Sequence, residues 1–419
     1  MAMLRWGLVL FIIFFSNLLA AQDMERVRKN LEILCSPKFN GRGYVGKGDS
    51  IAAQWIAQEF EQIGLKKFDN SYFQNFQLSI NTFPKKVSVK LGKKKLQIGK
   101  DFILQPYTTS SKGKAKILLL DTLIFTDANH RKTFFQQDLR RKALVFPAKF
   151  ANHLQKMQLE EMQKLAEMSI WVSLHQKLTA SLSTRQEGQT EIMLDSKLWD
   201  GTAQEISYDI FAHWIEKYTT RNVIGYIEGT QKKDSFVVFT GHYDHLGNMG
   251  GAYFPGANDN ASGITMLLEL AHYYKNNPPT YSVAFMAFAA EEAGLIGSHY
   301  YTENPFFPLS QIKCLFNLDL VGTGDEGITI VNGSVFVEDF ETIERLNSQN
   351  QLLPKVAKRG KAANSDHYFF SEKGVKAFFI YTMGGIKAYH DINDRPASLP
   401  LTKYKELFRL LTLYVEQIH

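Results

Sequence analysis

Residues 281–292, YSVAFMAFAAEE, join an apolar run to two acidic residues. The run is typical of a strand that is buried on both faces, as the central strands of parallel sheets are. Glu291 and Glu292 at its end are costly to bury unless they are paired or bind a metal ion. Because neighbouring side chains diverge on an extended chain, we expect the two glutamates to have different roles.

Strand-like and helix-like segments alternate around this run. From residue 222 onward, strands are predicted at 222–227, 235–240, 314–320 and 378–381 besides the 281–289 run, and helices at 262–274 and 401–418. Toward the N-terminus, helices are predicted at 24–34 and from Asp49 or Ser50 to a stop at Gly64, followed by strand-like alternation at 72–91. Strands and helices of these lengths in alternation predict a layered α/β domain.

Further residues with metal-binding side chains lie where these segments end. His242 and Asp244 follow a predicted strand, and Asp244 is placed to accept a hydrogen bond from the second ring nitrogen of a metal-binding histidine. Asp319 lies within an apolar segment, where a solvated carboxylate is hard to explain. Reactive groups of open α/β folds gather at one edge of the sheet, so these side chains are expected to lie together.

Asp259 and His390 complete the set. Asp259 lies in GANDNASG, residues 256–263, directly before a predicted helix. An aspartate there often caps the helix, but Asn260 and Ser262 are also available for capping. Asp259 is then free to bridge two cations through its two oxygens. Asp394 follows His390 by four residues and is a candidate acceptor for its ring nitrogen.

The order of these clusters, with their flanking residues, resembles the co-catalytic di-zinc exopeptidases, a family that includes bacterial secreted aminopeptidases and glutamate carboxypeptidase II-like proteins. The resemblance covers residues 222 to about 400, and more loosely 31–65, where Gly41 and Arg42 also look like the family. It implies a three-layer α/β/α domain with a mixed, mostly parallel sheet. It also implies two zinc ions and peptide substrates with a free N-terminus.

The resemblance gives each residue a role. The implied ligands divide between two zinc ions: His242 and Asp319 on one, Glu292 and His390 on the other, and Asp259 on both. The peptide bond from Asp259 to Asn260 is expected to be cis. Glu291 is the implied general base, and Tyr389 matches a tyrosine that in some members hydrogen-bonds the developing oxyanion. Hydrolysis by a metal-activated water is the implied reaction.

Two other functions fit the same scaffold. A glutaminyl cyclase shares several of these residues but uses one zinc ion and hydrolyses nothing. That branch usually has a tryptophan soon after the paired glutamates, where this chain has AGLIGS at 293–298. A non-catalytic binding protein would have lost ligands, whereas all six positions are filled here. An aminopeptidase is favoured over a carboxypeptidase because no arginine among the site loops is assignable to a substrate carboxylate.

Three residues near these motifs, His245, Asp366 and His367, are interpreted as structural hydrogen-bonding groups, with a role in the substrate pocket as the alternative. Residues 92–208 contain none of the six site residues. They show strand-like runs at 117–120, 143–146 and 170–174 and a helix-like segment at 151–168. We interpret 92–208 as an inserted protease-associated-like domain between two parts of the catalytic domain, 22–91 and 209–419.

The first residues and the composition bear on location and partners. Arg5 precedes an apolar stretch at 6–21, which favours a signal peptide (1–21) cleaved near Ala20 or Ala21 and export to a periplasm or the outside; an uncleaved membrane anchor is the alternative. The net charge of +6 is spread over 48 basic and 42 acidic residues, which argues against a nucleic-acid partner. Cys35 and Cys314 are expected either to pair or to remain buried thiols.

Overall fold

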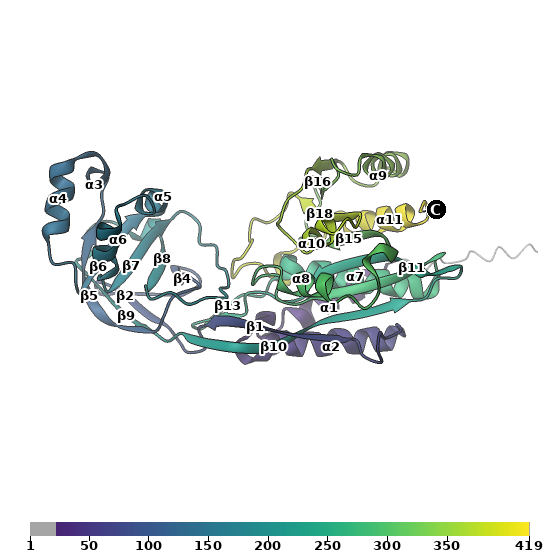
Figure 1. The fold of residues 1–419 in the computed structure, drawn as a ribbon, viewed down its shortest axis with the longest axis horizontal. Coiled ribbons are helices and arrows are strands. Elements are labelled where there is room, and N and C mark those ends of the chain that lie inside the picture. Colours follow the sequence, from purple (N-terminus) through teal and green to yellow (C-terminus); the bar gives the residue numbers. More distant parts are fainter. Residues whose placement is uncertain (1–21, 419) are drawn as a thin grey trace, which may run out of the picture.

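The computed structural model describes residues 22–418, which form two large sheets in two lobes (Figure 1). The predicted signal peptide at 1–21 lies outside the described residues. Within 22–418, no helix has both the length and the apolar character needed to cross a membrane. Cys35 and Cys314 are buried free thiols, so the alternative without a disulfide is the one found.

The main sheet has eight strands and contains the segments predicted around the two glutamates. In spatial order the strands are β1 (Phe73–Thr82), β10 (His213–Ile227), β14 (Tyr281–Phe288), β11 (Lys232–His242), β15 (Ile312–Leu318), β18 (Ala377–Met383), β16 (Gly327–Val331) and β17 (Val356–Arg359). The four central strands, from β14 to β18, are parallel, while β10 and β16 pair antiparallel to them on either side. The predicted mixed sheet is confirmed.

Helices cover both faces of this sheet and produce three layers. One face is covered by α1 (Met24–Leu34), α2 (Gly48–Ile63), α7 (Ser262–Asn276), α9 (Val337–Asn350) and α11 (Tyr404–Val415). The other face is covered by α8 (Ile296–Glu303) and α10 (His367–Glu372). Each face of the sheet packs a separate hydrophobic core, because side chains alternate between the two faces along β11. Val237 and Phe239 belong to the core on the first face, and Val238 to the core on the second. The three-layer fold follows.

The N-terminal helices illustrate how local sequence sets these elements. Asp23 caps α1, since its carboxylate accepts hydrogen bonds from the N–H groups of Glu25 and Arg26. Gly64 ends α2 with a φ of 84°, as its position predicted. Asp49 does not cap α2; its buried carboxylate instead accepts hydrogen bonds from hydroxyls of β10.

The second sheet lies in the inserted lobe. Its strands, in spatial order, are β3 (Lys94–Leu96), β2 (Ser88–Leu91), β9 (Glu205–Ile210), β5 (Ser111–Leu119), β6 (Lys142–Pro147), β7 (Ile170–His175), β8 (Glu191–Asp195) and β4 (Phe102–Leu104). Its helices are α3 (Leu123–Thr126), α4 (Ala128–Gln136), α5 (Ala151–Leu154) and α6 (Leu159–Ala166). The predicted domain limits, 92 and 208, fall inside this sheet, because β2 begins at Ser88 and β9 ends at Ile210.

One predicted helix of the inserted lobe is interrupted. The sequence suggested a helix-like segment at 151–168, but α5 ends at Leu154 and α6 begins at Leu159. Gln158 has extended backbone, and its N–H donates to the carboxylate of Glu161 at 3.2 Å. A glutamate at the third position of a helix often caps the helix N-terminus in this way, so a new helix begins after Gln158. Apolar spacing alone does not reveal such a break.

The two lobes share a packed boundary. The inserted core includes Leu246, Met249, Ala252 and Phe254 from the segment after β11. The turn at 249–252, between the short strands β12 (Asn248–Met249) and β13 (Ala252–Tyr253), is bonded on both sides: Gly250 N donates to Phe83 O, and Val87 N donates to Gly250 O. The segment that leads from β11 toward α7 therefore packs against the inserted lobe.

Candidate metal centre

The residues predicted as ligands meet at the carboxyl ends of the parallel strands. His242 ends β11, the two glutamates follow β14, and Asp319 follows β15. His390 lies in the loop after β18. Parallel strands direct their carboxyl ends to one edge, which is where open α/β folds hold their sites. Ala290 and Leu320 have φ values of 58° and 59°, so the chain turns sharply directly after β14 and β15.

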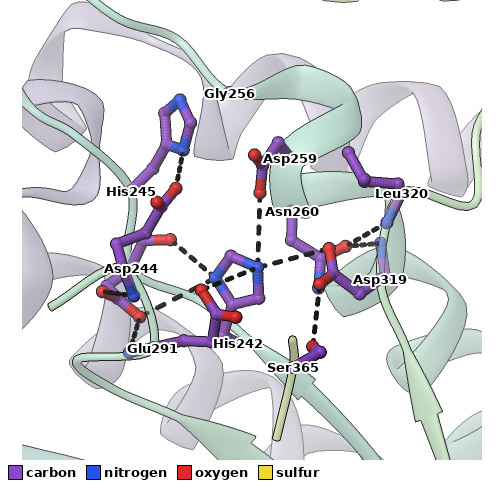
Figure 2. A network of polar contacts seen from close by, with 12 residues as sticks. His242, Asp244, His245, Gly256, Asp259, Asn260, Glu291, Asp319, Leu320 and Ser365 are labelled. Atoms are coloured by element: carbon purple, nitrogen blue, oxygen red, sulfur yellow. Dashed lines mark hydrogen bonds and ion pairs between the residues drawn. The ribbon is translucent and has the colours of Figure 1, made fainter. Parts of the chain in front are cut away.

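Asp259 lies between the two histidines. Its Oδ1 is 3.3 Å from Nε2 of His242, and its Oδ2 is 3.2 Å from Nε2 of His390. Figure 2 shows the first of these contacts, with Asp259 above the His242 ring. Oδ2 has no aligned hydrogen-bond donor among residues 22–418, although it is buried. One carboxylate thus presents an oxygen to each half of the cluster.

The other carboxylates extend the cluster on each side. Asp319 Oδ1 lies 3.3 Å from Nε2 of His242, and Glu291 Oε2 lies 3.9 Å from it. On the far side, Glu292 Oε2 lies 3.0 Å from Nε2 of His390. Ligand atoms of His242, Glu291 and Asp319 lie within 4.8 Å of one another, as do those of His242, Asp259 and Glu292. The six residues predicted from the sequence therefore converge on one cluster.

Glu291 and Glu292 have opposite electrostatic environments. Burial raises the pKa of Glu291 well above its ordinary value, and the nearby Asp319 carboxylate adds to this, although His242 opposes it. Burial also disfavours ionisation of Glu292, but His390 and His245 outweigh it and lower its pKa to about 2. His245 Nδ1 lies 2.6 Å from Oε1 of Glu292. Two adjacent and chemically identical side chains are thus held in different states.

The histidines also respond to the surplus of carboxylates. Burial opposes the charged form of both rings, yet Glu291 and Asp319 raise the pKa of His242 well above its ordinary value. In the same way, Glu292 and Asp259 raise the pKa of His390 to about 11. The cluster therefore favours positive charge between its acidic groups, which is the electrostatic environment of a cation site.

Asp244 supports the cluster in a different way from the one expected. Its main-chain oxygen, 3.1 Å away, is the closest acceptor to His242 Nδ1, while its carboxylate is 3.8 Å away. The carboxylate instead accepts from the N–H groups of Glu291 and Glu292, at 3.1 and 3.3 Å. Figure 2 shows the contacts of Asp244 with His242 and with Glu291 at its left. Asp244 thus fixes the turn that carries the two glutamates.

Asp394 likewise has a role other than the expected one. It was a candidate acceptor for His390, but its carboxylate accepts from the N–H groups of Asn258 and Asp259, at 2.8 and 3.0 Å. Its pKa is raised to about 6 by burial, which these two hydrogen bonds oppose. The peptide bond from Asp259 to Asn260 is cis, as expected. Asp394 therefore holds the turn that presents Asp259.

Tyr389 stacks on the ring of His390, with ring centroids 3.8 Å apart. The residue is 48% exposed, so its ring also meets solvent. Partial burial, together with the carboxylates of Asp259 and Glu292, raises the pKa of its phenol above the ordinary value. The phenol is therefore protonated at neutral pH and able to donate a hydrogen bond.

Sequence reasoning missed or undervalued several supporting groups. Ser365 Oγ donates to Asp319 Oδ2 at 2.9 Å, and His245, which was interpreted as structural, contacts a predicted ligand directly. The nearest acceptor of His390 Nδ1 is the main-chain oxygen of Ala180, 2.7 Å away in the inserted lobe. A main-chain acceptor leaves no signal in the residue type, so no motif could have identified it.

Arg42 orders the loops beneath the cluster. Its buried guanidinium donates to five main-chain oxygens, those of Leu34, Tyr243, Pro255, Gly256 and Asp259, at 2.7 to 3.2 Å. Tyr243 follows His242, and Asp259 belongs to the cluster, so one side chain ties together the segments that carry His242 and Asp259. The planar fork of arginine suits several carbonyls at once.

Comparison with known proteins identifies the domain that carries this cluster. Residues 222–415 match the model of peptidase family M28. This segment belongs to peptidase family M28. The matched range includes all six residues of the cluster and confirms the resemblance to the zinc exopeptidases.

Curated relatives and solved structures agree with the assignment to M28. Aminopeptidase YwaD of Bacillus subtilis is 32% identical over 215 residues, 49% of this chain and 45% of that protein. A probable zinc metalloprotease of Pyricularia oryzae is 31% identical over 132 residues, 30% of this chain and 25% of that protein. The aligned part of this chain thus spans less than half of either relative. The chain, including the inserted lobe, is also similar in fold to two solved structures.

An aminopeptidase from Aneurinibacillus sp. strain AM-1 superposes with a TM-score of 0.64 at 20% identity, over 95% of this chain and 94% of that one. A zinc aminopeptidase from Bacillus subtilis superposes with a TM-score of 0.68 at 18% identity, over 93% and 95%. At these identities the likeness shows the fold. Because it covers nearly the whole of each chain, the fold with its inserted lobe is shared.

Proposed function

We propose that the protein is a zinc-dependent aminopeptidase that removes N-terminal residues from peptides. The observation that carries the proposal is the position of Asp259, whose two oxygens each face the Nε2 atom of a different histidine. A carboxylate shared by two imidazole-containing half-sites is the arrangement expected of a bridging ligand in a two-metal centre. The aminopeptidase and zinc metalloprotease relatives support the same function.

The donor set fits zinc. Imidazole nitrogens and carboxylate oxygens are both common zinc ligands, and the cluster offers two of the former and several of the latter. In both histidines Nδ1 faces a main-chain oxygen, which can only accept, so that nitrogen carries the proton and Nε2 is directed into the cluster. His242 and Asp319 would hold one ion, Glu292 and His390 the other, and Asp259 both.

The chain's own residues then divide the remaining work. When bound, two zinc ions supply Lewis acidity, which lowers the pKa of a nearby water and polarises the substrate carbonyl. Glu291 takes the proton of the attacking water and delivers it to the leaving amine. The protonated phenol of Tyr389 donates a hydrogen bond to the oxygen that gains negative charge. Carboxylates of the cluster also attract the free amino group of the substrate.

Hydrolysis of aminoacyl chromogenic substrates, measured with and without a chelator, tests the proposal. We expect release of the chromophore that the chelator abolishes and zinc restores, and no release when the amino group is acetylated. Two zinc ions per chain by elemental analysis should accompany this activity. One zinc ion with cyclisation of an N-terminal glutamine would instead indicate a glutaminyl cyclase. Zinc without either reaction would indicate a binding protein.

We also propose that the protein acts after export, on the pattern of residues 1–21. Mass spectrometry of the protein recovered from the periplasm or the medium should give a mature N-terminus near residue 21 or 22. Recovery of the full-length chain in the membrane fraction would support the uncleaved anchor instead.

A further inference from the structure

One loop of the inserted lobe crosses to the M28 domain and reaches a predicted metal ligand. It spans residues 176–190, between β7 and β8. Ala180 in this loop is 1% exposed and forms two main-chain contacts with His390. Its N–H donates to His390 O at 3.2 Å, and its carbonyl oxygen accepts from His390 Nδ1 at 2.7 Å. Both the backbone and the ring of His390 are thus bonded to one residue of the inserted lobe.

The loop is anchored on either side of this contact. Leu182 packs against the cores of both lobes. Ser183 O accepts from the N–H of Asn81 in β1 at 2.9 Å, and the side chain of Gln186 donates to Asn81 Oδ1 at 2.9 Å. The segment that carries His390 also contributes to the shared boundary, since Ile392 packs on the inserted core. In Figure 1 the yellow-green chain that leads away from β18 extends toward the inserted lobe.

His390 differs from the other predicted ligands in the lobe that supplies its supporting hydrogen bond. His242 Nδ1 faces Asp244 O, Asp319 accepts from Ser365, and the turn of Asp259 is held by Asp394. All of these partners lie in the M28 domain. Among the described residues, the hydrogen-bond partner of His390 Nδ1 lies in the inserted lobe. The half-site of Glu292 and His390 therefore depends on contact between the lobes, whereas the half-site of His242 and Asp319 does not.

We propose that the 176–190 loop is a positioning element, which completes the zinc half-site of Glu292 and His390 through the main chain of Ala180. The Ala180 carbonyl fixes the proton on Nδ1, so that Nε2 is directed toward the ion. Groups that orient a metal-binding histidine in this way typically contribute 10–100-fold to metal affinity. The inserted lobe would then control occupancy of one zinc site. This inference rests on the proposed function, because it requires zinc at the cluster.

Ala180→Pro tests the proposal. Proline removes the N–H that bonds His390 O and constrains the backbone on either side of it. Zinc content is measured by elemental analysis after equilibration of the holoenzyme with graded concentrations of chelator. We expect A180P to keep one ion as wild type does and to release the other at a chelator concentration at least about 10-fold lower.

Two control variants separate this effect from damage to the loop. Ala180→Gly keeps both main-chain contacts and should release zinc as wild type does. Thr184→Pro places the same residue in the same loop at an exposed position, whose N–H donates no hydrogen bond among residues 22–418. Thr184→Pro should therefore also release zinc at the wild-type chelator concentration. Release of both ions from A180P at the wild-type concentration overturns the inference, as does equal weakening of both ions.

Wild-type protein supplies a second test if circular dichroism shows that A180P does not fold. Coupling between sites is reciprocal, so zinc should protect the Ala180 N–H from hydrogen exchange. We expect exchange in a peptide covering 178–182 to slow at least about 10-fold when zinc is added to metal-free protein, with no change at 137–141. Unchanged exchange at 178–182 overturns the inference. Wild type that binds no zinc would overturn the proposed function itself.

Discussion

Glu191 in the inserted sheet and the cluster at the edge of the main sheet differ in how their buried carboxylates are paired. In the inserted sheet, Glu191 accepts hydrogen bonds from Ser173 Oγ and Tyr107 OH, at 2.9 and 2.8 Å. Neutral hydroxyls satisfy this single carboxylate, and burial raises its pKa. In the main sheet, the carboxylates of Asp259, Glu291, Glu292 and Asp319 surround the imidazoles of His242 and His390. A single buried carboxylate whose oxygens accept from hydroxyl donors needs no metal ion to satisfy its hydrogen bonds.

A cluster of carboxylates without enough donors favours a bound cation, because several buried negative charges persist together only when they are paired or protonated. The number of acidic groups relative to donors, and not burial alone, therefore separates a metal centre from a structural polar contact. Substitutions in the two sheets should therefore have unequal effects on zinc.

The largest effect is expected for Glu291→Gln. The amide cannot take a proton from water, so kcat should fall by about 10²–10⁴-fold while zinc content and thermal stability remain those of wild type. Glu292→Gln, the same change one residue later, is the matched control. It should lower the zinc content, and any loss of activity should follow from that loss of zinc. Steady-state kinetics and elemental analysis on both proteins check this. Equal behaviour of the two variants would refute the division of roles.

Asp259→Asn tests the comparison between the sheets directly. Removing one charge from the residue that faces both histidines should lower the affinity for both zinc ions by more than about 100-fold, a larger loss than an orienting group typically gives. Glu191→Gln makes the equivalent change in the inserted sheet and should leave zinc content unaltered. Chelator titration of the purified proteins measures both. Zinc loss from the Glu191 variant would show that the sheets are not independent.

A smaller effect is expected for Asp394→Ala, which removes the acceptor for the N–H groups of Asn258 and Asp259. The turn that presents Asp259 should loosen, and zinc affinity should fall by about 10–100-fold. Asp391→Ala, three residues earlier, is the control, because the Asp391 carboxylate bonds only Asn393 among the described residues. Isothermal titration with zinc distinguishes them. Equal affinities for the two variants would contradict the role of Asp394.

The smallest effect concerns the pH dependence of the metal-free protein. Glu292, with its pKa lowered from 4.5 to about 2, stabilises the fold above pH 4.5 and loses this effect as pH falls through 2. His390, with its pKa raised from 6.5 to about 11, stabilises the fold below pH 6.5 and loses this effect as pH rises through 11. The difference in Tm between wild type and His390→Gln should therefore be largest between these two limits, at pH 4.5–6.5.

Differential scanning calorimetry in the presence of a chelator measures this difference. His175→Gln in the inserted sheet is the control: burial lowers the pKa of His175, and no ion pair with a carboxylate is recorded for it among residues 22–418. Its Tm difference from wild type should show no maximum in that interval. A difference for His390→Gln that grows steadily above pH 6.5 would contradict the assignment.

Much of the site could be predicted from local sequence because its residues follow apolar strands or precede a helix. The glutamate pair that ends YSVAFMAFAAEE and the GANDNASG turn both lie where the pattern placed them, at the sheet edge. The supporting contacts could not be predicted in the same way. Asp244 and Asp394 were expected to accept from histidine rings, but the carboxylate of each accepts from N–H groups of a neighbouring turn. Side-chain direction in a loop depends on contacts that its own sequence does not contain.

Local sequence alone indicated the fold class, several strands and helices of the α/β domain, and the side chains proposed to bind metal, because burial periodicity and residue chemistry are local properties. Only the tertiary structure decided which protonation state each glutamate favours, since the His390 and His245 rings that lower the pKa of Glu292 come from distant segments. It also decided the partner of His390, a main-chain oxygen 210 residues away. Such contacts depend on how the two lobes pack, and a carbonyl is present at every residue.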